Sequence, residues 1–202
     1  MIWESQPWKE GLLADADNIE NLRFDDALAE VRFEKSIFLT GFVCRKLLEA
    51  KKLTDRAASY DVKCTKYAPL DGGRIPDLLN WHRLGEFYDF ATPRKATVKL
   101  TFFANQLVHS FIFAPTMNEE DETRIFGFYV ASDNDRAKFL YQYEITEIIK
   151  MMRLIGNDSV VCSKFVRSDK REWVVRNYGE SDPEAKEDFI ELEIDNGFQR
   201  QS

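Results

Sequence analysis

The chain has 202 residues, a net charge of −7 and 44% hydrophobic residues. This length suits one domain with a core of its own, and the composition excludes a globally disordered chain. The acidity also argues against a protein that binds nucleic acid over its whole surface. The cysteines Cys44, Cys64 and Cys162 are widely spaced and form no C-x-x-C pair, so we expect reduced thiols in a cytoplasmic protein.

No segment is expected to cross a membrane. The longest apolar run, residues 36–44, is far shorter than the roughly 20 residues that a spanning helix needs. Residues 1–8 have neither the basic start nor the long apolar stretch of a secretory signal. We therefore expect no membrane among the partners of this protein.

The first quarter of the chain is predicted to be helical. Apolar residues recur every three or four positions in residues 3–22 and again in residues 25–53, as in helices that bury one face. Gly41 interrupts the most apolar stretch of the second helix, where we expect it to let another element approach closely. We also expect a homodimer through the first helices, because the large apolar side chains of Trp3 and Trp8 would otherwise be exposed to solvent.

The rest of the chain is predicted to form mostly strands. Residues 96–103 and 107–113 are expected to pair as a hairpin, because apolar residues alternate in both. Short helices are expected at residues 76–81 and 146–155, the second ending at Gly156. The predicted strands are residues 60–67, 96–103, 107–113, 123–131, 139–143, 159–166 and 172–176.

This order of elements indicates an α+β fold, with an N-terminal helical pair, whose second helix is long, packed on a mostly antiparallel sheet. Residues 1–178 are expected to form one domain, followed by an acidic tail at residues 179–202. From Tyr178 onwards, eight acidic and two basic residues give a net charge of −6. Apolar and acidic residues alternate in residues 188–195, which predicts either an added strand or a poorly ordered terminus.

No sequence motif identifies a reaction. The chain has no phosphate-binding loop, no dinucleotide-binding fingerprint, and no G-x-S-x-G or H-E-x-x-H motif. With two histidines and three scattered cysteines, we expect neither a metal site nor a cofactor. The leading interpretation is a non-catalytic binding or regulatory protein that contacts a protein partner through the acidic tail.

The first alternative to a binding protein is an enzyme, and it is suggested by the polar and aromatic segment at residues 74–94. If the short helix at residues 76–81 continued, His82 and Glu86 would lie one turn apart and could share a proton. Arg94 could hold an anionic group, so these three residues predict a metal-independent hydrolase or nuclease. A structured loop would use the same polar side chains to satisfy its own backbone. The binding residues predicted in this segment are Arg83 and Tyr88.

A basic hairpin at residues 164–176 predicts a nucleic-acid accessory factor as the second alternative. Basic residues alternate there with aromatic ones, and such a pattern can hold phosphates and stack bases. A charged hairpin edge that prevents association between sheets would use the same residues. The predicted contacts are Arg167, Arg171 and Trp173. The acidic tail and this hairpin are also expected to mask each other.

Overall fold

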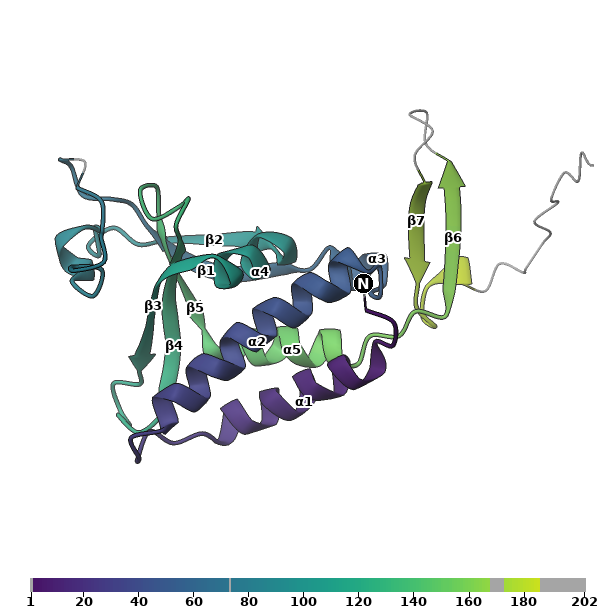
Figure 1. Cartoon of the computed structure of the whole chain (residues 1–202), viewed down its shortest axis with the longest axis horizontal. Coiled ribbons are helices and arrows are strands. Elements are labelled where there is room, and N and C mark those ends of the chain that lie inside the picture. The colour runs from purple at the N-terminus through teal and green to yellow at the C-terminus, as the bar shows by residue number, and fades with distance from the viewer. Residues whose placement is uncertain (1, 73, 168–172, 186–202) are drawn as a thin grey trace, which may run out of the picture.

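The computed structural model describes residues 2–72, 74–167 and 173–185, and it has an α+β fold (Figure 1). Helices α1 (Gln6–Asn21) and α2 (Ala29–Glu49) form the N-terminal pair. Pro7 lies in the first turn of α1, where its missing amide hydrogen costs nothing. Leu12, Ala16 and Ile19 recur along one face of this helix and are buried, as the periodicity predicts.

The sheet has five strands in the order β2–β1–β5–β4–β3, and every neighbouring pair is antiparallel. The core formed by its inner face is covered by α4 (Leu100–Val108), α5 (Ile145–Gly156) and the N-terminal pair (Figure 1). The predicted fold class is therefore confirmed. The strands are β1 (Asp61–Tyr67), β2 (Arg94–Lys99), β3 (Ser110–Met117), β4 (Ile125–Ser132) and β5 (Leu140–Glu144).

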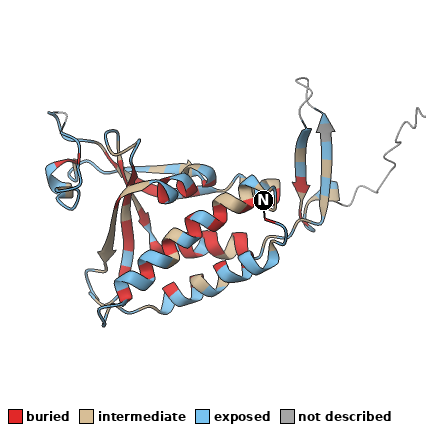
Figure 2. Cartoon of the chain, in the orientation of Figure 1, coloured by how far each residue is buried: buried red, intermediate tan, exposed pale blue. Residues whose placement is uncertain are grey.

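Aromatic side chains join the helices to the sheet. The ring centroid of Phe33, on α2, lies 6.1 Å from those of both Phe113 and Phe128. Phe103, on α4, lies 4.9 Å from Tyr143. All of these except Phe113 are fully buried, and Figure 2 shows the buried residues concentrated between the helices and the sheet. The many phenylalanines thus serve mainly to build this core.

Gly41 allows the closest contact between two helices. A Cβ at this position would lie 2.5 Å from the Cβ of Leu107 on α4, which is closer than two carbon atoms can pack. Only glycine lets the backbone of α2 approach α4 to this distance. The predicted role of Gly41 is confirmed.

The predicted hairpin of residues 96–103 and 107–113 is wrong. The strand β2 ends at Lys99, and helix α4 follows at once. Leu100, Phe103, Ala104 and Leu107 are buried at spacings of three and four, which is the helical period. Three alternating apolar residues at the start of this segment matched a strand equally well, and burial against α2 decided the outcome. As a result, β2 pairs with β1, and β3 pairs with β4.

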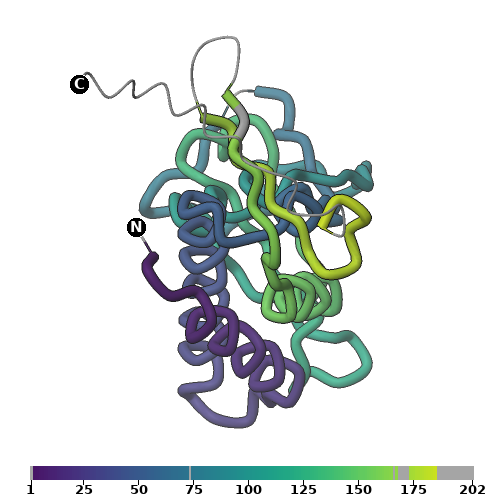
Figure 3. Tube along the Cα trace, turned by 90° about the vertical axis from the view of Figure 1, so that its right-hand side faces the viewer, coloured from purple at the N-terminus to yellow at the C-terminus, as the bar shows by residue number. Residues whose placement is uncertain are grey.

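A second, two-stranded sheet stands apart from the first (Figure 1), and its strands lie in front of the body in Figure 3. It is the hairpin of β6 (Cys162–Arg167) and β7 (Trp173–Tyr178), close to the predicted strands, and β6 follows α5 after a short connection. The short helices α3 (Asp55–Ala58) and η2 (Pro183–Ala185) lie near its base. The predicted strand at residues 188–195 lies outside the described residues.

Candidate functional site

The β6–β7 hairpin presents two distinct faces. Its residue pairs run from Cys162 opposite Tyr178, at the base, to Arg167 opposite Trp173, at the far end. Opposite residues of an antiparallel pair share a face, and successive residues alternate between faces. Phe165 therefore lies on the same face as Arg167 and Trp173. We call these three residues the hairpin platform.

The base of the hairpin is anchored by Asn177, which is 2% exposed. Its side-chain amide donates hydrogen bonds to the main-chain carbonyls of Lys51 at 2.8 Å and Leu53 at 2.9 Å. Its side-chain oxygen accepts a hydrogen bond from the Ser163 hydroxyl at 2.8 Å, and its backbone N–H donates to Asp55 at 3.2 Å. The amide group of this side chain thus fixes β7 to the segment between α2 and α3, and its oxygen holds β7 to β6.

A second buried polar group holds the segment before β6. The Asp158 carboxylate accepts hydrogen bonds from the Thr54 backbone N–H at 2.9 Å and from the Thr54 hydroxyl at 2.6 Å. The Lys9 ammonium donates to the Asp158 carbonyl at 2.8 Å and lies 3.7 Å from its carboxylate. Burial lowers the pKa of Lys9, and the charge of Asp158 opposes that shift. These contacts connect α1 and α3 to the start of the hairpin.

The hairpin platform itself is exposed. Phe165 and Trp173 are each 64% exposed, although large aromatic side chains usually find cover. The Arg167 guanidinium lies 5.5 Å from the centre of the Trp173 ring, and the Lys164 ammonium lies 5.4 Å from that of Tyr178. Cations over aromatic rings add about 0.5–1 kcal/mol at exposed sites. The platform therefore combines two rings that are open to solvent with the cation of Arg167, whereas Lys164 and Tyr178 lie on the other face of the hairpin.

Charge is distributed unevenly along the hairpin. Residues 161–178 contain five basic and two acidic residues, a net charge of +3. Near the base, Arg176 pairs with Asp55 at 3.2 Å. Toward the far end, the sequence adds Lys170 and Arg171, which lie outside the described residues. The hairpin therefore offers stacking surface and positive charge, the two requirements for holding a single-stranded polyanion.

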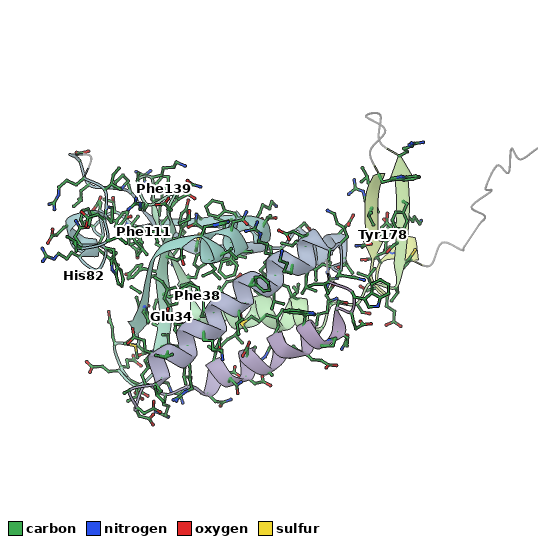
Figure 4. The ribbon with its side chains drawn as sticks, viewed as in Figure 1. Glu34, Phe38, His82, Phe111, Phe139 and Tyr178 are labelled. Atoms are coloured by element: carbon green, nitrogen blue, oxygen red, sulfur yellow. The ribbon has the colours of Figure 1, made fainter. Side chains whose placement is uncertain are left out.

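The structure places His82 at the opposite end of the molecule from Tyr178 of the hairpin (Figure 4). Residues 76–81 form turns rather than the predicted short helix, and His82 is exposed. Glu86 lies in η1 (Leu84–Glu86) and pairs with Arg74 at 3.4 Å and with Arg83 at 3.6 Å. Within the described part of the chain, His82 and Glu86 share no hydrogen bond or ion pair. The predicted interaction between His82 and Glu86 required a continuous helix, and the structure has turns there instead.

The other residues predicted in this segment have structural contacts. Arg94 begins β2, is exposed, and contributes to the lowered pKa of Asp89, which hydrogen bonds from Thr92 and Ala91 lower more. Tyr88 is 1% exposed, and its hydroxyl donates to the main-chain carbonyl of Arg136 at 2.7 Å. Burial raises the pKa of Tyr88. Tyr88 thus belongs to a small cluster of buried residues beside β1, β3, β4 and β5.

Clefts are found in other parts of the described structure. Five of them, with volumes of about 510 to 840 Å³, are lined by residues other than His82, Glu86 and Arg94. In the described ranges, three or more acidic, histidine or cysteine side chains nowhere converge as they would to hold a metal ion. The geometry around His82 therefore adds no support to the enzyme interpretation, which stays a prediction.

Asn177, Asp158 and Thr54 were missed by the sequence analysis. Except for Ser163, which is 14 residues from Asn177, and Ala57, which is 3 residues from Thr54, the partners of their side chains lie more than 100 residues away in the chain. The only local signal is the hydroxyl of Thr54, which accepts a hydrogen bond from the Ala57 N–H and so caps α3. Residues that fix a hairpin to a body through main-chain carbonyls leave no motif in the sequence.

Comparisons with known proteins found no similar protein. No protein-family model, no curated protein and no solved structure matches this chain. None of the helices in the described ranges has the length and apolar character needed to cross a membrane. Interpretation of the site therefore depends on its own geometry and charge.

Proposed function

We propose that this protein is a non-catalytic binding protein that contacts single-stranded nucleic acid through the hairpin platform. The observation that supports this proposal is the exposure of Phe165 and Trp173 on one face of a hairpin with a net charge of +3. Phe165 and Trp173 are diagonal neighbours across the two strands, so their side chains start about 7 Å apart. This spacing allows two bases of one strand to be held side by side.

Unpaired bases suit this surface better than a duplex does. Stacking of a base on an aromatic side chain contributes about 1–3 kcal/mol, and it requires a base whose face is open. In a duplex the faces of the bases are covered by their neighbours. In this proposal, Arg167, which lies beside Trp173, binds a phosphate next to a stacked base.

The acidity of the whole chain is compatible with this proposal because the charge is segregated. The residues from Tyr178 onwards carry −6 of the total of −7. Electrostatic attraction falls off over roughly 8 Å at physiological ionic strength. The hairpin's own residues, 161–178, carry a net charge of +3, which attracts a strand bound there. Protein partners also use exposed Trp and Arg, but they do not require this excess of positive charge.

A binding experiment with an oligonucleotide tests the proposal. Fluorescence anisotropy of a labelled 20-nucleotide oligothymidylate, at about 50 mM salt, should show saturable binding. Trp173→Ala should weaken this binding about tenfold, the effect expected from the loss of one stacked base. Trp3→Ala is the matched control, because Trp3 is 93% exposed and lies at the start of the chain.

Salt dependence provides a second readout. If Arg167 meets a phosphate, Arg167→Gln should reduce the slope of log affinity against log salt by about 0.7. Arg74→Gln, which alters an exposed arginine far from the hairpin, should leave the slope unchanged. No binding by the wild-type chain, or equal losses in Trp173→Ala and Trp3→Ala, would rule out the platform as a nucleic-acid site.

A further inference from the structure

The hairpin platform has no cover among the described residues. Phe165 and Trp173 are each 64% exposed, and Val174, on the other face, is 38% exposed. A sheet of only two strands is at best marginally stable in water. The contacts of Asn177 hold one end of the hairpin, and the rest of its surface and its strand edges can accept further chain.

The acidic tail leaves the body beside this surface. The described chain continues to Ala185 in η2, and its path after β7 is held by the Gly179 N–H, which donates to the Asp182 carboxylate at 2.6 Å. Residues 186–202 follow. An extended segment of that length reaches up to about 56 Å, whereas a six-residue strand is about 20 Å long. The tail can therefore reach every part of the hairpin.

The tail matches the hairpin in charge and in pattern. Residues 178–202 carry a net charge of −6, against +3 for residues 161–178. In residues 188–195, Ile and Leu alternate with acidic residues, so an extended tail would have one apolar face and one acidic face. The rings of Phe165 and Trp173 lie on one face of the hairpin, and the cations of Lys164 and Arg176 lie on the other. A tail paired along a strand edge would therefore continue both faces, with its apolar residues beside the rings and its acidic residues beside these cations.

We propose that the acidic tail, residues 180–202, docks on the β6–β7 hairpin and competes with nucleic acid for the hairpin platform. The docking follows from charge, reach and exposure, whereas the competition rests on the proposed function. The tail is thus a built-in inhibitor that a polyanion displaces. A second copy of the chain is a weaker competitor for this surface, because a short tether gives the tail an effective concentration of about 1 mM.

Tethering makes even a weak contact effective. With a dissociation constant of about 0.1 mM, a tail at an effective concentration of about 1 mM would occupy the hairpin about 90% of the time. Binding of nucleic acid would then be weakened about tenfold. Removing the negative charge that holds the tail on the hairpin should therefore raise the affinity for nucleic acid by up to about tenfold.

The test uses the full chain with three charges removed from the tail, Glu191→Gln, Glu193→Gln and Asp195→Asn. The matched control removes three charges from the exposed loop between β3 and β4, through Glu119→Gln, Glu120→Gln and Glu122→Gln. Hydrogen exchange over residues 161–178 is measured first, without nucleic acid. Exchange should be faster by up to about tenfold in the tail variant and unchanged in the control.

Oligothymidylate affinity is measured next, and the tail variant should bind several-fold more tightly than the wild type. Unchanged exchange in the tail variant overturns the docking, even if oligothymidylate binds. Faster exchange without oligothymidylate binding by any variant supports the docking and refutes the nucleic-acid function. Equal gains in affinity for the tail and control variants indicate a general effect of net charge and overturn the competition.

Discussion

Replacing Gly41 by alanine should destabilise the protein, although alanine is the better helix former. In a helix interior, the change from glycine to alanine contributes about 1 kcal/mol of stability. At this position the new Cβ would lie 2.5 Å from the Cβ of Leu107 and 3.0 Å from its Cδ1. Neither Cβ can rotate away, so α2 and α4 must separate by about 1 Å to restore ordinary packing. Overpacking of this kind costs about 3 kcal/mol, which leaves a net loss of about 2 kcal/mol.

Gly11 provides the matched control for this prediction. It lies inside α1, is exposed, and has no atom within 4 Å of the position of an added Cβ. Gly11→Ala should therefore stabilise the protein by about 0.5–1 kcal/mol. The two variants should differ by almost 3 kcal/mol, which corresponds to a difference of roughly 6–12 °C in Tm for a chain of this size.

Urea unfolding followed by circular dichroism at 222 nm measures both changes. The midpoint should fall for Gly41→Ala and rise for Gly11→Ala, with similar slopes for both variants. If both substitutions raise the midpoint, α2 and α4 do not pack as closely as the structure shows, and the steric argument fails.

Three further predictions concern buried groups. Burial raises the pKa of Cys44 to about 12 and of Cys64 to about 11, so a thiol reagent at pH 8 should label Cys162 quickly in the native protein and all three only after unfolding. Fast labelling of Cys64 would contradict its burial. Tyr143→Phe should stabilise the protein by about 1 kcal/mol in urea unfolding, because the hydroxyl it removes is buried and has no partner in the described structure. A large loss would reveal a partner. Asp158→Asn should cost about 3 kcal/mol, since it leaves a buried ammonium without its counterion, and an unchanged urea midpoint would refute the role of this pair.

The elements with strong local signals could be predicted from the sequence. The helical period in α1 and α2 and the stop signal of α5 both lie within short windows of sequence. Segments with short apolar patterns were harder, because three or four apolar residues fit a strand and a helix equally well. The segment of α4 shows this limit, since its helical conformation buries residues such as Leu107, which packs against Gly41 of the distant α2.

The order of the strands and the anchoring of the hairpin could not be predicted. The central pair of the sheet joins Thr65 to Gln142, far apart in the chain, and nothing near either residue specifies the other. The same is true of Asn177 and the carbonyls of Lys51 and Leu53. The basic and aromatic character of the hairpin was visible in the sequence, whereas the exposure of Phe165 depends on the hairpin standing away from the body.

The two ends of the hairpin lie next to each other, because the Val161 N–H donates a hydrogen bond to the Tyr178 carbonyl at 2.9 Å. A segment with adjacent ends can be replaced by another of similar span without disturbing the body that holds it. Among the residues whose burial is described, the main core includes none from β6 or β7, so changes at the far end of the hairpin carry little cost in folding. The architecture thus separates the base, which holds the hairpin to the body, from a far end whose side chains can be exchanged at little cost in folding.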